Sequence, residues 1–578
     1  MAAFSETAPE WWPFSAGTTA LVAGITIFFL AHHLSSRKLD PREPPVLAPA
    51  IPVIGHLLGM ALLGGRYIKN LGIRHQRQLP VFTLPVPGSR IYVVTDPSLA
   101  AAVQRASRIM SFNPIVPELT QRVLGLDDAT VEITRRNVDP GPGEERGFLP
   151  DIQDMVSAWL GPGEYLSTLS LDAAAEMRDE IAPYASSAAA SSSSRGGTTD
   201  LLSWVRHLVT LSTAKYLYGP QNPIALDPSL ETSFWDFDHG LGSLLINVFP
   251  SITARRAYAG REKLAAALLA YLEAGTHTTS GSRIVRRRVE IALEHGWAMP
   301  AIAREELSFL FAGIVNATTS TFWILLHLYA DPGLLAVVRR EIESVLSPRN
   351  VEKEPAVGSA PPPLLLRITD LRDKCPVLVA VYRECLRLGS DTYSTRAVKE
   401  DHLLANQYFL KKDAVVQIAG GVIHADPQIW GADVLAFNPK RFLDRTNSQS
   451  DAEALRPDND NDNDNDDTGS GSGFKTRPKK QQQQQGNAFH PAAFRAFGGG
   501  KTLCPGRHFA MNEILAFVAL VVLQFDMKPA RGDKIDVPPK NDGVLPVHIL
   551  EPVRPVEVVI SKREDGFARD GLDVEFAM

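Results

Sequence analysis

Cysteine is scarce in this sequence, and positive charge is not in excess. Three cysteines occur among 578 residues: Cys375, Cys385 and Cys504. An odd and small number of cysteines is typical of a protein in a reducing compartment, and it excludes a disulfide framework. The formal net charge is -6 and no basic stripe runs along the chain, which argues against nucleic acid as a partner. Hydrophobic residues make up 44% of the chain and charged residues 21%, an ordinary balance for a large globular protein with an ample core.

One long apolar run lies near the N-terminus. The run from Phe14 to Leu34 is long enough to span a bilayer, which takes about 20 residues. Trp11 and Trp12 would sit at one interface, while Arg37 and Lys38 follow the other end. Because no Lys or Arg precedes the run, we expect a single membrane span with the large C-terminal body in the cytosol. A cleaved signal peptide is the alternative, but the length of the run and the lack of a basic N-terminal region weigh against it.

Composition divides the chain into an anchor, a hinge, a body and insertions. Residues 1–36 form the expected anchor, 37–56 a proline-rich hinge and 57–578 the main body. Three low-complexity stretches in the body have compositions that cannot bury enough apolar surface to fold. We expect them to be disordered insertions, near residues 185–198, 349–363 and 446–486.

The body is predicted to be mainly helical with a small β region. Two β-rich runs around Pro87-Gly88 predict a hairpin. Helical patterns dominate residues 100–300, and a long helix is predicted from Pro300 to Ala330, where Asp331-Pro332-Gly333 ends it. The middle of this helix is apolar all round, so it should lie buried in the protein.

A glycine-rich loop delivers Cys504 to the start of an apolar helix. Gly498, Gly499 and Gly500 allow positive φ and close backbone approach, and Pro505 suits the first helical position. The free N–H groups and the positive dipole end of a helix favour a thiolate there. A cysteine without a second cysteine near it does not fit a four-ligand zinc site, but it fits the axial thiolate of a haem iron. The alternative is a small buried hydrophobic residue, the usual role of a free cysteine.

The spacing in this loop points to a known family. The pattern Phe497-x-x-Gly500-x-x-x-Cys504-x-Gly506 resembles the haem-binding loop of the cytochrome P450 family. The resemblance implies that Cys504 is the proximal ligand of haem b, that Phe497 packs beside the sulfur and that Gly500 shapes the loop. The family often has Arg or His two residues before the Cys, contacting a haem propionate. Thr502 stands there in this chain, so that contact must come from elsewhere.

Three further charged residues fall where the same family has a structural network. Glu384-Cys-Leu-Arg387 alone would be an ordinary acid–base pair on a helix surface. Its place between the long helix and the cysteine loop resembles the Glu-x-x-Arg motif of the family, and Arg441 resembles the third member. The resemblance implies a buried network of these three residues under the haem. It also implies that Arg396 contacts a propionate, the alternative being a solvent-exposed arginine.

The long helix carries a departure from the family pattern. Ala312-Gly313 leaves room for a flat ligand, and Asn316, one turn on, would hydrogen-bond an oxygen species, bridge a local break in the helix or simply bond a neighbouring carbonyl. The usual family pattern, Ala-Gly-x-(Asp/Glu)-Thr, supplies an acid–alcohol pair for proton delivery. Here Val315 and Asn316 occupy those positions. Asn316, followed shortly by Thr321-Phe322-Trp323, resembles the branch that contains bile-acid sterol hydroxylases and prostacyclin synthase.

Taken together, the resemblance implies a cytochrome P450 fold preceded by one transmembrane helix in the endoplasmic reticulum membrane, with the haem-thiolate catalytic domain in the cytosol. The implied function is oxidation or hydroxylation of a small lipophilic substrate, such as a sterol, terpenoid or polyketide. Electrons would come from NADPH through a cytochrome P450 reductase docking near Lys501 and Arg507. A reductase-independent isomerase or dehydratase of an oxygenated lipid is one alternative, and a non-catalytic haem protein that binds a ligand is another.

Overall fold

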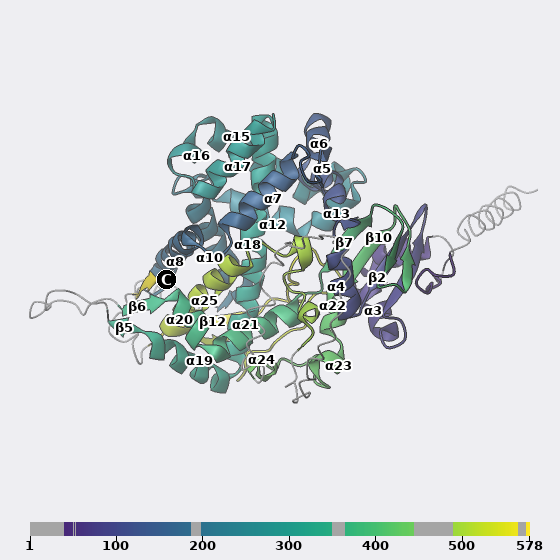
Figure 1. Ribbon diagram of the computed structural model, residues 1–578. Helices are drawn as coiled ribbons and strands as arrows, with labels where there is room; N and C mark the ends of the chain where they lie inside the picture. Colours follow the sequence, from purple (N-terminus) through teal and green to yellow (C-terminus); the bar gives the residue numbers. More distant parts are fainter. Residues whose placement is uncertain are drawn as a thin grey trace, which may run out of the picture.

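The computed structural model describes residues 40–49, 51, 54–185, 198–348, 364–443, 489–563 and 574–578. The expected membrane span at 14–34 and nearly all of the three expected insertions lie outside the described residues. The part of the chain that is described is mostly helical, as the sequence predicted, with one sheet on the right of the helices in Figure 1 and further strands on their left.

Two long apolar helices form the centre of the molecule. Helix α18, Met299–Ala330, agrees with the predicted long helix, and α25, Arg507–Gln524, follows the cysteine loop. They pack against each other, and α18 also packs on α10, Leu201–Tyr218. Both α18 and α25 are long and apolar enough to cross a membrane, but most of their apolar stretches are buried inside the protein. They are therefore core helices, which explains why they are apolar all round.

The remaining helices surround this centre. Helix α19 begins at Pro332, directly after α18, because the Asp331 side chain accepts a hydrogen bond from the Leu334 amide and caps it. In chain order these helices are α2 Gly55–Leu63, α3 Gly65–His75, α4 Pro97–Arg105, α5 Val116–Leu124, α6 Asp128–Arg135, α7 Phe148–Trp159, α8 Glu164–Ala185, α11 Pro223–Leu226, α12 Ser229–His239, α13 Leu241–Ile246, α14 Pro250–Thr253, α15 Arg255–Glu273, α16 Thr276–Thr279, α17 Arg283–Glu294, α19 Pro332–Val345, α20 Ile368–Lys374, α21 Pro376–Gly389, α22 Gly420–His424, α23 Pro427–Trp430 and α24 Lys440–Leu443.

The strands form one five-stranded sheet and smaller ones. The five-stranded order is β1-β2-β10-β7-β3, in which β10 runs parallel to β2 and antiparallel to β7. The other sheets are β11-β12-β4, β13-β6-β5 and the hairpin β8-β9. The strands are β1 Val81–Val86, β2 Ser89–Val94, β3 Met110–Ser111, β4 Thr198–Asp200, β5 Ser347–Pro348, β6 Leu364–Arg367, β7 Tyr393–Val398, β8 His402–Leu404, β9 Tyr408–Leu410, β10 Val415–Ala419, β11 Phe525–Pro529, β12 Glu557–Lys562 and β13 Val574–Ala577.

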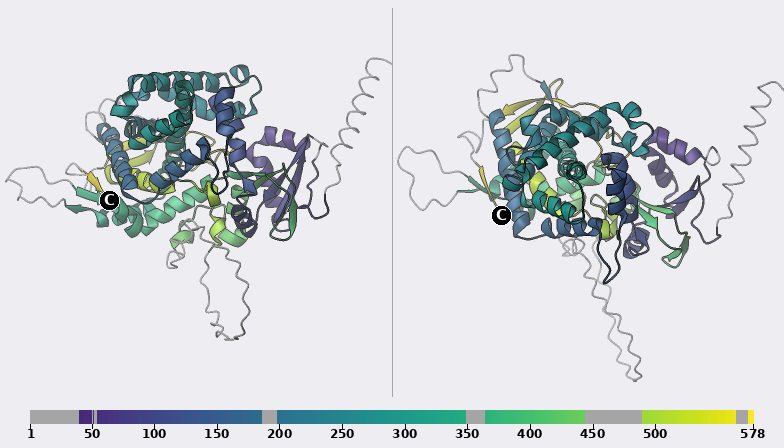
Figure 2. Two further views of the ribbon diagram at one scale, coloured as in Figure 1. Left: turned by 45° about the horizontal axis from the view of Figure 1, so that its top comes forward. Right: turned by 90° about the horizontal axis from the view of Figure 1, so that it is seen from above.

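The five-stranded sheet joins distant parts of the sequence beside the helical body. Strands β1 and β2 form the hairpin predicted around Pro87-Gly88, with Val86 opposite Ser89. Strands β7 and β10, from after α21, complete the sheet, which lies beside the helices in both views of Figure 2. This arrangement brings Arg396 on β7 close to the loop before Cys504, since its guanidinium donates to the Gly499 carbonyl at 3.4 Å.

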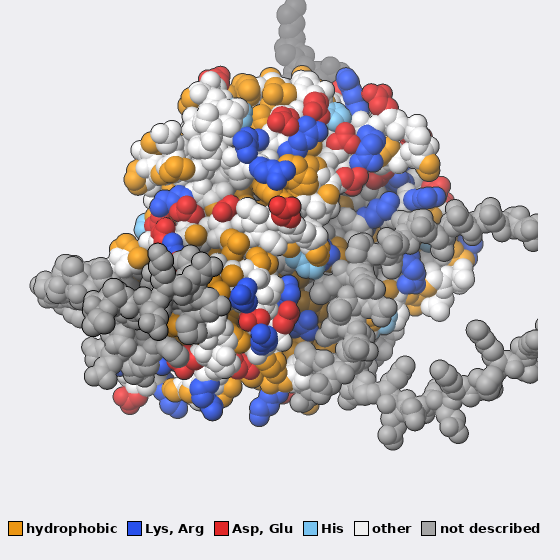
Figure 3. Space-filling view, turned by 60° about the vertical axis from the view of Figure 1, so that its left-hand side comes forward, with side chains coloured by type: hydrophobic (Ala, Val, Ile, Leu, Met, Phe, Trp, Pro, Cys, Tyr) orange, Lys and Arg blue, Asp and Glu red, His pale blue; other side chains and the backbone are white. Residues whose placement is uncertain are grey.

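Charged side chains of both signs are interspersed on the face shown in Figure 3, with apolar side chains among them. That face therefore carries no extended field of one sign.

Candidate functional site

The loop before Cys504 is closed by its own backbone. The Cys504 amide donates to the Phe497 carbonyl at 2.9 Å, and Gly498 and Gly500 have φ of 77° and 61°, a region that favours glycine. Gly499 was expected to share this conformation but is extended, with φ of 165°. A Cβ at this position would lie 2.0 Å from Nε2 of Gln104, so any other residue would displace the end of that side chain.

Cys504 lies partly buried between this loop and α25. The helix begins at Arg507, two residues later than expected, because Pro505 and Gly506 form a turn ahead of it. Burial raises the pKa of the Cys504 thiol, while the backbone N–H of Gly506 and the charge and N–H of Arg507 lower it. The loop therefore provides donors for a thiolate, and a cation at the sulfur would offset the cost of burying it.

Two buried arginines meet beside this loop. Arg396 and Arg495 are 4% and 2% exposed, and burial lowers the pKa of each to about 10, with the charge of Arg396 contributing to the shift at Arg495. Arg396 donates to the carbonyl of Thr395 at 2.7 Å and to the hydroxyl of Thr502. Arg495 donates to the Ser394 hydroxyl at 3.0 Å, while its Nε has no hydrogen-bond partner.

Within the described ranges, neither guanidinium forms an ion pair with a carboxylate of the protein. Two uncompensated buried cations are costly, so the site calls for an anionic group that the described residues do not supply. The two propionates of a haem would meet this need, and the residues present therefore fit that group. The sequence motifs pointed to Arg396 but missed Arg495. The only signal for Arg495 was a charged residue inside the apolar segment just before Phe497.

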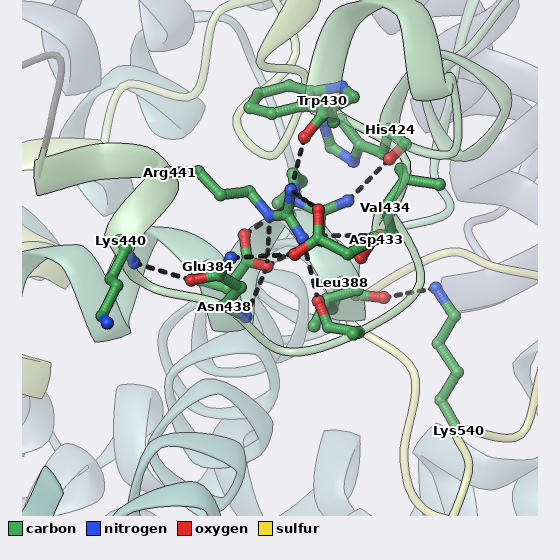
Figure 4. Close-up of polar contacts among 12 residues, drawn as sticks. Glu384, Leu388, His424, Trp430, Asp433, Val434, Asn438, Lys440, Arg441 and Lys540 are labelled. Carbon is green, nitrogen blue, oxygen red and sulfur yellow. Dashed lines mark hydrogen bonds and ion pairs between the residues drawn. The ribbon is translucent and has the colours of Figure 1, made fainter.

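Glu384, Arg387 and Arg441 come together as the sequence motifs predicted. Figure 4 shows Glu384 beside Arg441. Arg387 donates to both carboxylate oxygens of Glu384, at 2.7 and 2.8 Å, and Arg441 Nε donates to the same carboxylate at 2.9 Å. Each arginine also donates to backbone carbonyls, Arg387 to those of His424 and Val434 at 2.7 and 2.9 Å. All three charged side chains are almost fully buried, so the network fixes the end of α21 to the loop that leads into α24.

Helix α18 turns two small or polar residues towards open space. Ala312 and Asn316, one turn apart, are exposed in a stretch that is otherwise mostly buried. Gly313 faces a different way, because a Cβ on it would lie 3.1 Å from Cγ2 of Thr213 on α10. Its lack of a side chain thus allows close helix packing and not the room for a flat ligand expected from the sequence. Val315 is fully buried, so the position that usually carries the acid points into the core.

A short C-terminal segment, residues 548–551, connects to several helices around this space. The Ile549 amide donates to Oδ1 of Asn316 at 3.0 Å, and Trp323 Nε1 donates to the Leu550 carbonyl at 2.9 Å. His548 and Glu551 contact residues of α10 and α12. The structure therefore gives Oδ1 of Asn316 a partner that the sequence did not suggest, a backbone amide 233 residues away.

A partly buried thiol in a glycine-rich loop, paired buried arginines and a mainly helical fold together define a haem-thiolate protein. The family model described as Cytochrome P450 matches residues 294–551. The cytochrome P450 monooxygenase nodJ of Hypoxylon pulicicidum is 30% identical over 534 residues, covering 91% of each chain. A cytochrome P450 monooxygenase of Gibberella zeae is 26% identical, covering 90% of this chain and 88% of its own. Cytochrome P450 7A1 of Sus scrofa is 23% identical, covering 91% and 94%.

The chain belongs to the cytochrome P450 family. It is accordingly an oxidoreductase of the monooxygenase class, and its cofactor is haem b held by a cysteine thiolate, as is known for the family. A solved structure described as retinoic acid bound cyanobacterial CYP120A1 has the same fold, with a TM-score of 0.59 and 18% identity. The match covers 90% of this chain and 99% of that one.

Proposed function

We propose that Cys504 is the iron ligand and that the protein oxidises a small lipophilic substrate with O2 and electrons from NADPH. The observation that carries this proposal is the pair Arg396 and Arg495, whose buried charges lie beside the cysteine loop without a carboxylate of the described chain. In this proposal the two arginines hold the propionates, and Phe497 packs beside the sulfur. When bound, the haem supplies the redox chemistry on dioxygen, while the protein orients the substrate and excludes water.

Ala312 and Asn316 are proposed to form the wall of the substrate space. The small side chain of Ala312 would leave room for the cofactor and substrate, and Asn316 would offer them an amide N–H group. A relative in Cricetulus griseus is named cholesterol 7-alpha-monooxygenase, and the structural neighbour is described as binding retinoic acid. These names support a sterol or terpenoid as the first substrates to test, with polyketides next. The electrons are proposed to come from a reductase that docks near Lys501 and Arg507.

We also infer association with the endoplasmic reticulum membrane through the run at 14–34. Exposed apolar side chains support this inference. Helix α2 carries Leu62, which is 73% exposed, and the segment around α14 carries Phe249 and Ile252, at 73% and 76%. Burying such residues in lipid would remove apolar surface from water, in addition to the anchor itself.

The test is spectroscopic and then enzymatic. The reduced, carbon-monoxide-bound protein should show the long-wavelength absorption band that a thiolate ligand imposes, and Cys504→Ser should abolish it. Cys375→Ala is the matched control, because Cys375 is buried in the core and should leave the band unchanged. A Cys504→Ser protein that keeps the band would overturn the assignment.

Sterols, terpenoids and polyketides that change the visible haem spectrum should then be incubated with reductase and NADPH. The expected result is a product with one added oxygen atom or its oxidised derivative, formed only when both are present. Spectral change without any product would instead identify a non-catalytic ligand-binding protein.

A second candidate is an isomerase or dehydratase of an oxygenated lipid that needs no reductase. The observation that favours it is the loss of the usual acid–alcohol pair, since Val315 is buried and Oδ1 of Asn316 is occupied by the Ile549 amide. Turnover of a lipid peroxide without NADPH would select this reaction, and strict dependence on the reductase would exclude it.

A further inference from the structure

A cavity of about 640 Å³ lies near the C-terminal end of α18. The ends of α18, α21 and α22 line it, together with the segments around Leu435 and Pro538. His327 in its lining follows Asn316 by eleven residues, which places it roughly 16 Å further along the helix at about 1.5 Å per residue. The cavity is thus separate from the proposed substrate space, and its volume falls within the roughly 300–1,000 Å³ of small-molecule sites.

Three aromatic rings form one part of this lining. His327 stacks on Phe437, with ring centres 3.8 Å apart and planes 6° from parallel, and the ring of Trp323 lies 6.1 Å from that of His327. Burial lowers the pKa of His327 to about 4, so its ring is neutral at pH 7. This aromatic wall, formed by Trp323, His327 and Phe437, favours contact with another ring, because aromatic pairs contribute beyond the apolar area that they bury.

Two lysines share one carboxylate in the same lining. Lys69 Nζ lies 2.7 Å from Oδ2 of Asp391, and Lys540 Nζ lies 2.8 Å from Oδ1. Lys540 also donates to the Leu388 carbonyl, as Figure 4 shows. The side chains of the two lysines are 13% and 20% exposed, and burial lowers the pKa of Lys540 to about 8, which is still above neutrality. This lysine pair, Lys69 and Lys540, therefore carries one positive charge in excess of Asp391 at pH 7.

The other charged groups around the cavity balance one another. The network at the end of α21 holds two positive and two negative side chains: Arg387, Arg441, Glu384 and Asp433. Asp542, whose charge also acts on Lys540, forms an ion pair with Arg66. Burial lowers the pKa of His424 to about 3, so this neighbour is neutral. Within the described residues, the excess charge of the lysine pair is therefore left without a counter-ion.

We propose that this cavity binds a small aromatic carboxylate, with its ring against the aromatic wall and its carboxylate on the lysine pair. Each ammonium has three N–H donors. Lys540 directs two of them to protein groups and Lys69 directs one, so N–H donors remain for an anion. A carboxylate supplies the single negative charge that offsets the excess, whereas a doubly charged phosphate would exceed it and a neutral ring would leave it in place.

The experiment titrates the purified holoenzyme with 2-naphthoate by calorimetry while the visible haem spectrum is recorded. One equivalent should bind without changing that spectrum, since the cavity lies apart from the cofactor. The amide 2-naphthamide has the same ring without the charge. It should bind more weakly by about 10-fold, because a hydrogen bond to a charged group is stronger than one between neutral groups. Binding that appears only together with a change of the haem spectrum would place the acid in the substrate space and overturn the proposal.

The exposed rim of the cavity provides variants that leave the fold intact. Leu435 belongs to the lining and is 77% exposed. Leu435→Glu should weaken the binding of naphthoate by about 5-fold at low salt, because the added carboxylate repels the anion. Leu435→Lys adds a charge of the opposite sign at the same place and should not weaken the binding.

Lys540→Met removes one ammonium of the lysine pair and should weaken the binding of naphthoate by about 10-fold or more. Lys374→Met is the matched control, because Lys374 pairs with Asp370 at 3.0 Å outside this lining, so the affinity should not change. If Lys540→Met does not fold, the two Leu435 variants still provide the test. Absence of saturable binding, equal affinity for the acid and the amide, or equal affinity of Leu435→Glu and Leu435→Lys for naphthoate would overturn the proposal.

Discussion

Oδ1 of Asn316 on α18 accepts a hydrogen bond of 3.0 Å from the backbone amide of Ile549. The bond joins the helix that faces the proposed substrate space to the segment 548–551, which also contacts α10 and α12. Asn316 therefore holds a wall of the site in place, and its amide nitrogen remains the group that could contact a substrate. A residue that was expected to act on oxygen is in this respect a positioning residue.

Replacing Asn316 by Asp should keep the bond to Ile549, because a carboxylate oxygen also accepts from an amide. Replacing it by Ala leaves that buried amide without its partner, which typically costs about 1–3 kcal/mol. We expect Asn316→Ala to weaken substrate binding by about 5-fold or more and to broaden the set of oxidation products, with Asn316→Asp close to wild type. The measurements are titration of the substrate-induced spectral change and product analysis. Equal loss of turnover in both variants would show that the amide N–H group acts directly.

Substitution of Arg495, the partner of Arg396, should affect the stability of the apoprotein and the binding of haem in opposite directions. Without an anion between them the two buried guanidinium groups repel, so Arg495→Gln should leave the apoprotein as stable as wild type or more stable. The same change should weaken haem binding, by about 10-fold or more, since a hydrogen bond to a charged group contributes roughly 1.5–3 kcal/mol.

The measurements for this pair are the Tm of haem-free protein and the rate of haem transfer to a strong acceptor. Arg372→Gln is the control, because the side chain of Arg372 is 41% exposed and forms its ion pair with its neighbour Asp373. An Arg495→Gln apoprotein that is clearly less stable than wild type would mean that the arginine serves the fold and not the cofactor.

The sequence could predict those parts of the molecule that depend on local patterns. The bounds of α18 follow from its apolar stretch and from Asp331-Pro332, and the β1–β2 hairpin follows from Pro87-Gly88. The contacts of Glu384 with two arginines followed from motif spacing. Each of these features is set by residues close in sequence or by a family pattern.

The remaining features depend on contacts that no local pattern records. Gly499 lies against the side chain of Gln104, almost 400 residues earlier, so this contact could not be read from the loop itself. Gly313 likewise packs closely against Thr213 of α10. The bond from Ile549 to Asn316 involves a backbone N–H group, which every residue except proline carries, so it leaves no trace in the sequence.

Glu384→Gln should be strongly destabilising, because it leaves the buried Arg387 and Arg441 without their shared carboxylate. Breaking a buried ion pair on one side typically costs about 3–5 kcal/mol. We expect the variant to express poorly and to retain little haem, as measured by haem absorbance per protein. Asp433→Asn is the control: Asp433 also pairs with Arg441, but its side chain is about half exposed, so haem content should stay close to wild type. Normal haem content in Glu384→Gln would contradict a role of this network in retaining the cofactor.

Glu513 on α25 should make the stability of the folded protein depend on pH, and one substitution should remove this dependence. Its buried carboxyl accepts a hydrogen bond from the Tyr216 hydroxyl at 3.0 Å, and burial raises its pKa from 4.5 to about 8. Between these values the folded protein holds a proton that the unfolded chain has lost, so stability falls as pH rises, by about 1.4 kcal/mol per pH unit. Glu513→Gln removes the titrating group. Its Tm should equal that of wild type near pH 4.5 and should exceed it increasingly as the pH rises towards about 8. Glu118→Gln is the control, because Glu118 forms a half-exposed ion pair with Arg135. Its Tm should equal that of wild type at every pH. A difference between Glu513→Gln and wild type that does not grow with pH would show that Glu513 is ionised in the folded protein.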